Sequence, residues 1–521
     1  MNTTNSRTSN VVRNAIFTIV AQIIILVLAF VTRTFFIKIL GEDYLGLDGL
    51  FTSIILVFSL AELGIGNAIV YKLYKPIASG DIETAQRYIT FFKKAYLIII
   101  IVIFIVGLAI IPLLPFIVEW DETYNVRLVF VYLLFLANAL STYFLAHHQM
   151  ILMVNQRQST IAAVQSIIKI IVSIVECLLL FLTKNYYLYL IAKVAGNYLQ
   201  AIVIFLIAKK NYPALCISSK NKLSQDEKKE IGKDVYALSL RRVGGVVLSS
   251  TDNIVINQFI SLGLVGIYSN YTLIVTSIQT ITTQLFSSTT ASLGNFVAEN
   301  NNSDDVEKLF RTYTFSTYLV YGIASIFLLS LTNRFIELLW GADYLLSKYA
   351  VFLIVFNFFL YGFQSAINVF RDTTGLFRQG KYRSLISAGI NVASSIVLVL
   401  FMGIEGVILG TIISRLLVSS WYDPYVIYKH FFKKSVTRYF IRLGIYILLT
   451  FAVGLLVYYI QTLFDPTILN FVFVFLISFA SSFFLLLPFF KTEELNDLVG
   501  RLKSFIKRIF NNHQKNVKNE N

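Results

Sequence analysis

Long apolar stretches separated by short polar connections fill almost the whole sequence. About fourteen of them reach the roughly 20 residues that a helix needs to cross a bilayer. Their apolar residues run without interruption instead of alternating, which indicates transmembrane helices rather than the strands of a membrane barrel. We therefore predict an all-α polytopic membrane protein. The expected spans are 12–40, 45–72, 91–118, 128–151, 160–183, 186–208, 235–260, 265–291, 312–332, 349–370, 384–402, 404–422, 443–461 and 467–490.

The connections expected on the external side are short. The longest runs from Asn333 to Lys348, about 16 residues, which is close to the length of an ordinary connecting loop. A glycan polymerase or ligase in the membrane is expected to present a larger external loop. The sequence contains no phosphate-binding loop, no metal-ligand spacing and no nucleophile constellation. These patterns favour a transporter without a metal or other cofactor and argue against an enzyme.

The composition fits this class, because 56% of the 521 residues are hydrophobic and 14% are charged. The net charge of +15 raises the question of nucleic-acid binding. With alternating spans and a cytoplasmic N-terminus, however, about 35 of the 44 Lys and Arg fall in cytoplasmic segments. This positive-inside bias explains the charge by topology. We expect both termini in the cytoplasm, an uncleaved first helix and no nucleic-acid partner.

The chain contains a weak internal repeat with an offset of about 220 residues. The segment ILGEDYLGLDGLF at the end of the first span resembles FISLGLVGIYSNY at the end of the seventh. The matched pairs are Gly46 with Gly266, Leu47 with Ile267, Phe51 with Tyr271, Trp120 with Trp340, Tyr124 with Tyr344, and Arg157-Gln158 with Arg378-Gln379. Six spans separate the copies, so both enter the membrane in the same direction. This pattern predicts two pseudo-symmetric six-helix lobes that form a parallel repeat, followed by two C-terminal helices.

The repeat and the spans together predict five segments. These are an N-terminal lobe at 1–208, a cytoplasmic linker at 209–233, a C-terminal lobe at 234–430, spans 13 and 14 at 431–490, and a basic amphipathic tail at 491–521. In the linker, Ser224 and Glu227 fit a capping box at the start of a helix. The tail is expected to form a helix that either lies on an anionic membrane surface or is simply solvated.

Charged residues inside the expected spans are the candidates for function, because each needs a partner or water in the bilayer. The cations are Arg33, Lys169, Lys193, Arg241, Arg242 and Arg415, and the acids are Glu62, Glu176 and Asp252. The cations outnumber the acids. Cations that face a hydrated cavity would attract an anionic substrate, and arginine suits phosphate especially well. The alternative is that these groups form buried ion pairs or snorkel to the membrane interface.

Glu62 lies in the segment SLAELGIGNAI, beside Gly64 and Gly66. These glycines are expected to loosen the helix or to allow close helix packing. An acid in this position either pairs with Arg33 of the neighbouring helix or binds a coupling proton or Na⁺. The same two roles are open for Glu176 and Asp252.

The segment from Arg33 to Asp81, which begins RTFFIKILGEDYLGLDGLF, resembles the start of bacterial polysaccharide flippases of the Wzx type. These flippases belong to the multidrug/oligosaccharidyl-lipid/polysaccharide exporter (MOP) superfamily. FIELLWGADYLLS and VFLIVFNFFLYGFQSAINVFRDTTGLFRQGKYR are similar to the later half of the same family. The resemblance covers residues 11 to about 430.

The resemblance implies a V-shaped fold with a cationic central cavity in the bacterial cytoplasmic membrane. It implies alternating access that moves an undecaprenyl-diphosphate-linked oligosaccharide to the outer leaflet for capsule or exopolysaccharide biosynthesis. Membrane lipids and the polysaccharide polymerase and assembly machinery are the expected partners, and a monomer is sufficient. The alternatives are a cation-coupled multidrug antiporter of the same fold, a membrane enzyme, or an assembly scaffold that transports nothing.

Overall fold

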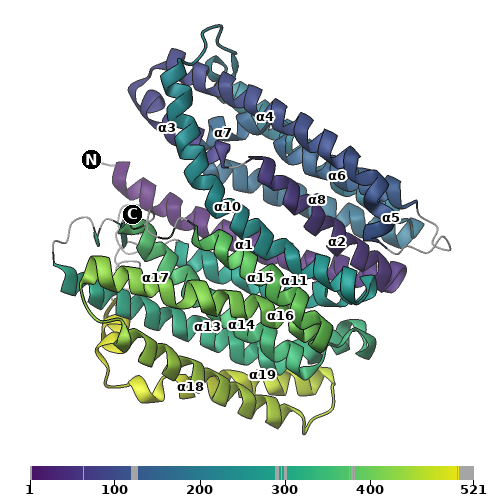
Figure 1. Ribbon diagram of the computed structural model, residues 1–521, viewed down its shortest axis with the longest axis vertical. Helices are drawn as coiled ribbons and strands as arrows, with labels where there is room; N and C mark the ends of the chain where they lie inside the picture. Colours follow the sequence, from purple (N-terminus) through teal and green to yellow (C-terminus); the bar gives the residue numbers. More distant parts are fainter. Residues whose placement is uncertain are drawn as a thin grey trace, which may run out of the picture. The chain divides into compact units, whose positions relative to one another are not determined.

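Every regular element in the described part of the chain is a helix, which confirms the all-α prediction (Figure 1). The computed structural model describes residues 3–62, 64–118, 127–287, 293–294, 296–297, 302–374, 376, 380, 382–501 and 503. The longer helices are α1 (Thr3–Leu40), α2 (Glu42–Phe58), α3 (Ile65–Ser79), α4 (Ile82–Ile110), α5 (Leu114–Ile117), α6 (Leu128–Tyr143), α7 (Ala146–Val154), α8 (Gln158–Thr183), α9 (Tyr186–Asn211), α10 (Gln225–Phe259), α11 (Leu262–Ser287), α13 (Ser303–Trp340), α14 (Lys348–Thr373), α15 (Arg383–Met402), α16 (Ile404–Ser414), α17 (Ser420–Ile427), α18 (Thr437–Gln461) and α19 (Ile468–Ser482). The short 3₁₀ and π segments are η1 (Ser59–Glu62), η2 (Ile111–Leu113), η3 (Ala214–Cys216), η4 (Ala342–Tyr344), η5 (Arg415–Ser419), η6 (Tyr428–Phe432), η7 (Phe483–Leu485) and η8 (Leu487–Phe489).

Twelve helical segments of the described residues are long and apolar enough to cross a membrane. They correspond to twelve of the fourteen predicted spans. The other two, 235–260 and 265–291, lie on α10 and α11. Both helices are less apolar: α10 carries Arg241, Arg242 and Asp252, and α11 is rich in Ser, Thr and Gln. Polar residues within membrane-length helices need partners in the protein or water.

Two predicted spans contain breaks that the hydropathy pattern does not reveal. The predicted span 45–72 is not one helix, because η1 follows α2 and Gly64 adopts a left-handed conformation (φ 78°) before α3 begins. The predicted span 128–151 is divided between α6 and α7 by Leu145, whose φ is 58°. Breaks inside a membrane protein free backbone polar groups, which are tolerated where protein or water covers them.

The chain divides into two compact units. Unit 1 comprises Met1–Ser269 with Ser384–Val392, and unit 2 comprises Asn270–Arg383 with Ala393–Asn521. The predicted linker 209–233 overlaps a helix at each end, because α9 continues to Asn211 and α10 begins at Gln225. The predicted capping box is confirmed, because Ser224 and Glu227 bond reciprocally to each other's backbone N–H. The two-lobe symmetry stays a prediction.

Unit 1 contains an unusually close contact between α2 and the start of α11. A Cβ atom added at Gly46 would lie 2.0 Å from the carbonyl oxygen of Leu262. One added at Gly266 would lie 2.5 Å from the carbonyl oxygen of Glu42 and 2.9 Å from the backbone nitrogen of Gly46. Gly46 and Gly266 are counterparts in the internal repeat. Small residues of this kind let two membrane helices approach until their backbones touch.

In unit 2, α13 packs against α14, α18 and α19. The rings of Tyr318 and Tyr446 stack with centroids 4.1 Å apart, and the hydroxyls of Ser330 and Ser478 lie 2.9 Å apart. Arg334 of α13 donates to the Gln461 side chain at 2.9 Å and also bonds carbonyl oxygens between α18 and α19. Helices α18 and α19, predicted as additions to the lobes, are therefore an integral part of unit 2.

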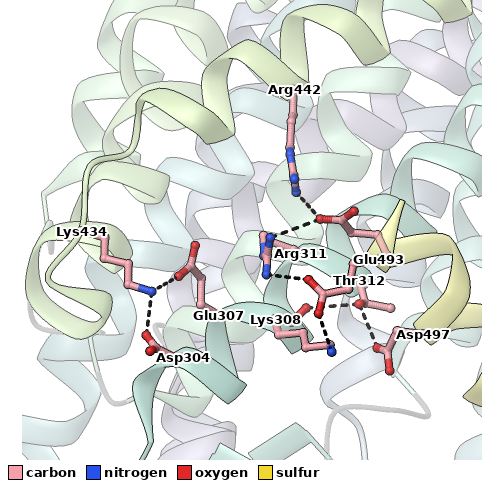
Figure 2. A network of polar contacts seen from close by, with 10 residues as sticks. Asp304, Glu307, Lys308, Arg311, Thr312, Lys434, Arg442, Glu493 and Asp497 are labelled. Atoms are coloured by element: carbon pink, nitrogen blue, oxygen red, sulfur yellow. Dashed lines mark hydrogen bonds and ion pairs between the residues drawn. The ribbon is translucent and has the colours of Figure 1, made fainter. Parts of the chain in front are cut away.

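The start of the tail docks on unit 2 through acidic residues. Residues 493–501 are helical, and Figure 2 shows how their side chains meet α13 and α18. Glu493 accepts from Lys308 at 2.6 Å, and Glu494 lies 2.5 Å from Arg442 and 3.5 Å from Arg311. Most of the predicted basic amphipathic tail, residues 502 and 504–521, lies outside the described residues. The described start of the tail is held by protein contacts.

This docking is expected to be independent of pH from about 8 down to about 5. A hydrogen bond from Lys308 lowers the pKa of Glu493. Burial raises the pKa of Asp497, but hydrogen bonds from Arg501 and Thr312 outweigh it, and the net pKa is lowered. Acids with depressed pKa values in the folded state stabilise it fully above their unfolded pKa and lose that contribution as the pH falls through the folded value. The hydrogen-exchange protection of residues 493–501, relative to the intrinsic rate at each pH, should therefore fall only below about pH 4. A loss of protection already at pH 6.5 would contradict this assignment, and Glu493→Gln with Glu494→Gln should lower the protection at pH 6.5 and above, where the wild type keeps its ion pairs.

Candidate functional site

Helices α1, α2, α8 and α9 bring five charged side chains of unit 1 together, and we call this group the charged cluster. It comprises Arg33, Asp48, Lys169, Glu176 and Lys193. The ammonium of Lys193 lies 3.2 Å from a carboxylate oxygen of Asp48. The buried Glu176 is close enough to Lys193, Asp48 and Lys169 to interact with their charges. The cluster therefore combines three cations with two acids.

The two innermost cations of the charged cluster are held by polar and aromatic partners. Arg33 donates a hydrogen bond to the hydroxyl of Ser269 and also interacts electrostatically with Asp48. The Lys193 ammonium lies 5.5 Å from the ring centroid of Phe135 and 5.9 Å from that of Tyr189. Aromatic faces stabilise a cation in a site with little water. These contacts fix the positions of both cations within the helices and do not draw them toward an interface.

An amide-rich cavity of about 290 Å³ lies one helical turn from the charged cluster. Its polar lining includes Ser141, Thr142, Gln149, Gln165, Asn197 and Gln200. Gln165 precedes Lys169 on α8 by four residues, and Asn197 follows Lys193 on α9 by four residues. Residues four apart share a helix face. Charged and uncharged polar groups thus form one continuous stripe along two membrane-spanning helices.

Glu62 forms a separate polar site with a partner other than the expected one. Its carboxylate accepts from Arg242 at 2.7 Å and from the hydroxyl of Tyr96 at 2.6 Å. The predicted pairing of Glu62 with Arg33 is wrong, because Arg33 belongs to the charged cluster. A Cβ at Gly66 would lie 2.7 Å from the Tyr96 hydroxyl. Gly66 therefore leaves the space in which Tyr96 reaches Glu62.

Asp252 and Arg415 have other partners. Asp252 of α10 accepts from the hydroxyl of Tyr268 at 3.1 Å. Arg415 belongs to unit 2, where it donates to Gln364 at 2.6 Å and lies 5.5 Å from the ring centroid of Tyr361. It begins the π-helical segment η5, and π-helical turns are frequent at functional sites. The side chain of Arg241 lies outside the described residues.

The sequence reasoning missed two acids. Asp48 was overlooked because the predicted span began at residue 45, which placed Asp48 in a first turn where acids are commonplace. Helix α2 begins at Glu42, so Asp48 lies almost two turns inside. In unit 2, Asp423 is fully buried and pairs with both Arg371 and Arg383. Its position in the polar segment SSWYDPY, directly before Pro424, is a signal in the sequence that could have identified it.

Comparison with known sequences identifies a family for the first half of the chain. Residues 11–293 match the family described as "Polysaccharide biosynthesis protein", and this range covers more than half of the sequence. It includes the charged cluster and the Glu62 site. A comparison with curated proteins found no match.

Solved structures show the same fold. The lipid II flippase MurJ in an inward closed conformation has a TM-score of 0.67 and 17% identity, over 93% of this chain and 100% of that one. A multidrug resistance MATE family transporter of the MOP superfamily, facing inward, has a TM-score of 0.59 and 15% identity, over 78% and 94%. A mutant of the Vibrio cholerae MATE transporter VcmN has a TM-score of 0.55 and 13% identity, over 83% and 99%. With the fold of these transporters and a family match over residues 11–293, the chain belongs to the polysaccharide biosynthesis protein family.

Proposed function

We propose that the protein is a flippase that moves a polyprenyl-diphosphate-linked oligosaccharide across the bacterial cytoplasmic membrane by alternating access. The observation that carries this proposal is the polar stripe on α8 and α9, where cations are followed by amides within membrane-spanning helices. The family membership and the fold shared with MurJ support the same class of function. We place both termini in the cytoplasm and assign the Wzx type on the sequence resemblance.

The two parts of the stripe match the two parts of such a headgroup. Arg33, Lys169 and Lys193 exceed the acids of the cluster by one charge, which favours an anionic diphosphate. Amides such as Gln165, Asn197 and Gln200 both donate and accept hydrogen bonds, as sugar hydroxyls require. The polyprenyl chain would stay in the lipid. Arg33, Lys169 and Lys193 are therefore the proposed diphosphate ligands, and Asp48 and Glu176 keep them in place.

The test is leaflet translocation in proteoliposomes that contain a short undecaprenyl-diphosphate-linked oligosaccharide, with an enzyme that modifies only glycans outside the vesicle. Arg33→Gln should slow translocation by roughly tenfold to a hundredfold, because a hydrogen bond to a charged group contributes about 1.5–3 kcal/mol. Lys222→Gln removes an exposed charge outside the stripe and should leave the rate unchanged. Wild-type rates from a well-folded Arg33→Gln protein would remove Arg33 from the site.

A cation-coupled multidrug antiporter is the second candidate, and one observation favours it. Asp48 and Glu176 place two carboxylates in the same membrane-embedded cluster, where a proton or Na⁺ could compete with Lys193. This reading predicts drug resistance in a sensitive host and its loss in Glu176→Gln. The flippase reading predicts neither result. A folded wild-type protein that exports drugs but translocates no lipid-linked glycan would establish the antiporter.

A further inference from the structure

A second cavity of unit 1, of about 380 Å³, lies between α4, the break between α6 and α7, and the loop 212–224. Three hydrogen bonds fix this loop to α4. The backbone N–H of Ser219 donates to Thr90 at 2.8 Å, Gln86 donates to the Ala214 carbonyl at 2.7 Å, and Asn221 donates to Glu83 at 2.8 Å. The cavity therefore has a defined wall on its polar side.

The lining of this cavity changes from polar to apolar along α4. Lys93, Lys94 and Ser219 stand at one end, and Leu97 and Phe144 stand at the other. The side chains of Leu97 and Phe144 are 57% and 39% exposed, as expected of residues that face lipid. A cavity that joins lysines to exposed apolar side chains within one helical turn has the polarity of the boundary between headgroups and acyl chains.

Among the described residues, the acids near the cavity pair with cations other than its two lysines. Arg87, one turn or more before them on α4, pairs with Glu227 at 3.3 Å, and Lys72 of α3 pairs with Glu230. No ion pair involves Lys93 or Lys94 among the described residues, and both are exposed. The cavity contains no acidic side chain in its described lining. An anion supplied from outside the chain would complete this site.

We propose that this cavity binds an anionic phospholipid of the cytoplasmic leaflet. The headgroup phosphate would contact Lys93 and Lys94, the hydroxyls of Ser218 and Ser219 would accept or donate around the headgroup, and an acyl chain would lie along Leu97 and Phe144. Basic pockets at the cytoplasmic membrane boundary bind such headgroups by charge and hydrogen bonding. The lipid site does not depend on the proposed transport function.

The test is lipid binding by the purified full-length protein in a neutral detergent, followed by native mass spectrometry. Phosphatidylglycerol is the probe, and phosphatidylcholine is its counterpart without net charge. Lys93→Gln combined with Lys94→Gln should weaken phosphatidylglycerol binding roughly thirtyfold, because each lysine near an anionic lipid surface contributes a factor of roughly five. Lys210→Gln combined with Lys229→Gln removes the same charge from exposed sites outside the cavity and should weaken it less than twofold, on the order of the error of the method.

Four outcomes would overturn the proposal. Three concern the binding comparison: phosphatidylglycerol binding by the Lys93/Lys94 variant that equals that of the wild type, a loss of binding in the control pair as large as in the test pair, or equal retention of phosphatidylcholine. A fourth arm adds undecaprenyl phosphate in equal amount. If it displaces phosphatidylglycerol completely, the cavity is selective for the polyprenyl lipid and the bilayer phospholipid is not its occupant. Because both lysines are exposed, their replacement leaves the packing of α4 intact, and circular dichroism checks this directly.

Discussion

Substitution of Asp423 by alanine should destabilise unit 2 by about 3–5 kcal/mol, because it leaves two buried guanidinium groups without their carboxylate. Arg371 lies 2.6 Å from one carboxylate oxygen of Asp423, and Arg383 pairs with the other. The Asp423 side chain is fully buried, and those of the two arginines are 7% and 9% exposed. Water cannot replace the lost partner at this depth without opening the ends of α14, α15 and α17.

Thermal unfolding of the purified protein in detergent measures this effect. Asp304→Ala is the matched control, because Asp304 also pairs with a cation, Lys434, but is 68% exposed. An exposed pair contributes about 0–1 kcal/mol, so this control should barely move the unfolding temperature. Similar shifts of the unfolding temperature in the two variants would show that the contribution of Asp423 to stability does not depend on its burial.

Substitution of Gly46 by leucine should prevent the native packing of α2 in unit 1. Its Cβ would stand 2.0 Å from the carbonyl oxygen of Leu262, and the backbone cannot rotate away as a flexible side chain could. Overpacking of a tight core typically costs 1–3 kcal/mol, and a clash with backbone on the opposite helix places the expected cost at about 3 kcal/mol or more. The charged cluster shares α2 with Gly46, so Asp48 would be displaced as well.

The yield of monodisperse protein and its unfolding temperature measure this prediction. Gly245→Leu provides the comparison, since Gly245 lies on α10 of the same unit and a Cβ there meets nothing within 4 Å. That variant should fold like the wild type. A Gly46→Leu protein of normal yield and stability would mean that α2 and α11 can separate at little cost.

The hydropathy pattern was enough to predict twelve membrane helices and the positions of their connections. A run of apolar residues has to be helical in lipid, so the signal is direct. The polar residues of α10 and α11 lower the mean hydropathy of these two helices, so the same rule identifies them less clearly as membrane helices. The breaks at Gly64 and Leu145 depend on local backbone conformation, which an average over a span conceals.

The site was predicted in part. Arg33, Lys169, Glu176 and Lys193 were named from their charge alone, and the structure brings them together. The partner of Glu62 was wrong because sequence proximity favoured Arg33, whereas the rotation of each helix about its axis selects Arg242. The same rotation places Asp48 against Lys193. Such pairings depend on tertiary packing, which the pattern of apolar and charged residues along a sequence does not specify.

The contact between Gly46 and Gly266 has a consequence for how this chain can evolve. The two positions are counterparts in the repeat, and in the folded chain each lies against the backbone of the helix that carries the other. A Cβ at either position would meet the backbone of the opposite helix. Gly46 and Gly266 therefore share one steric constraint, and a larger residue at either position is tolerated only if α2 and α11 move apart.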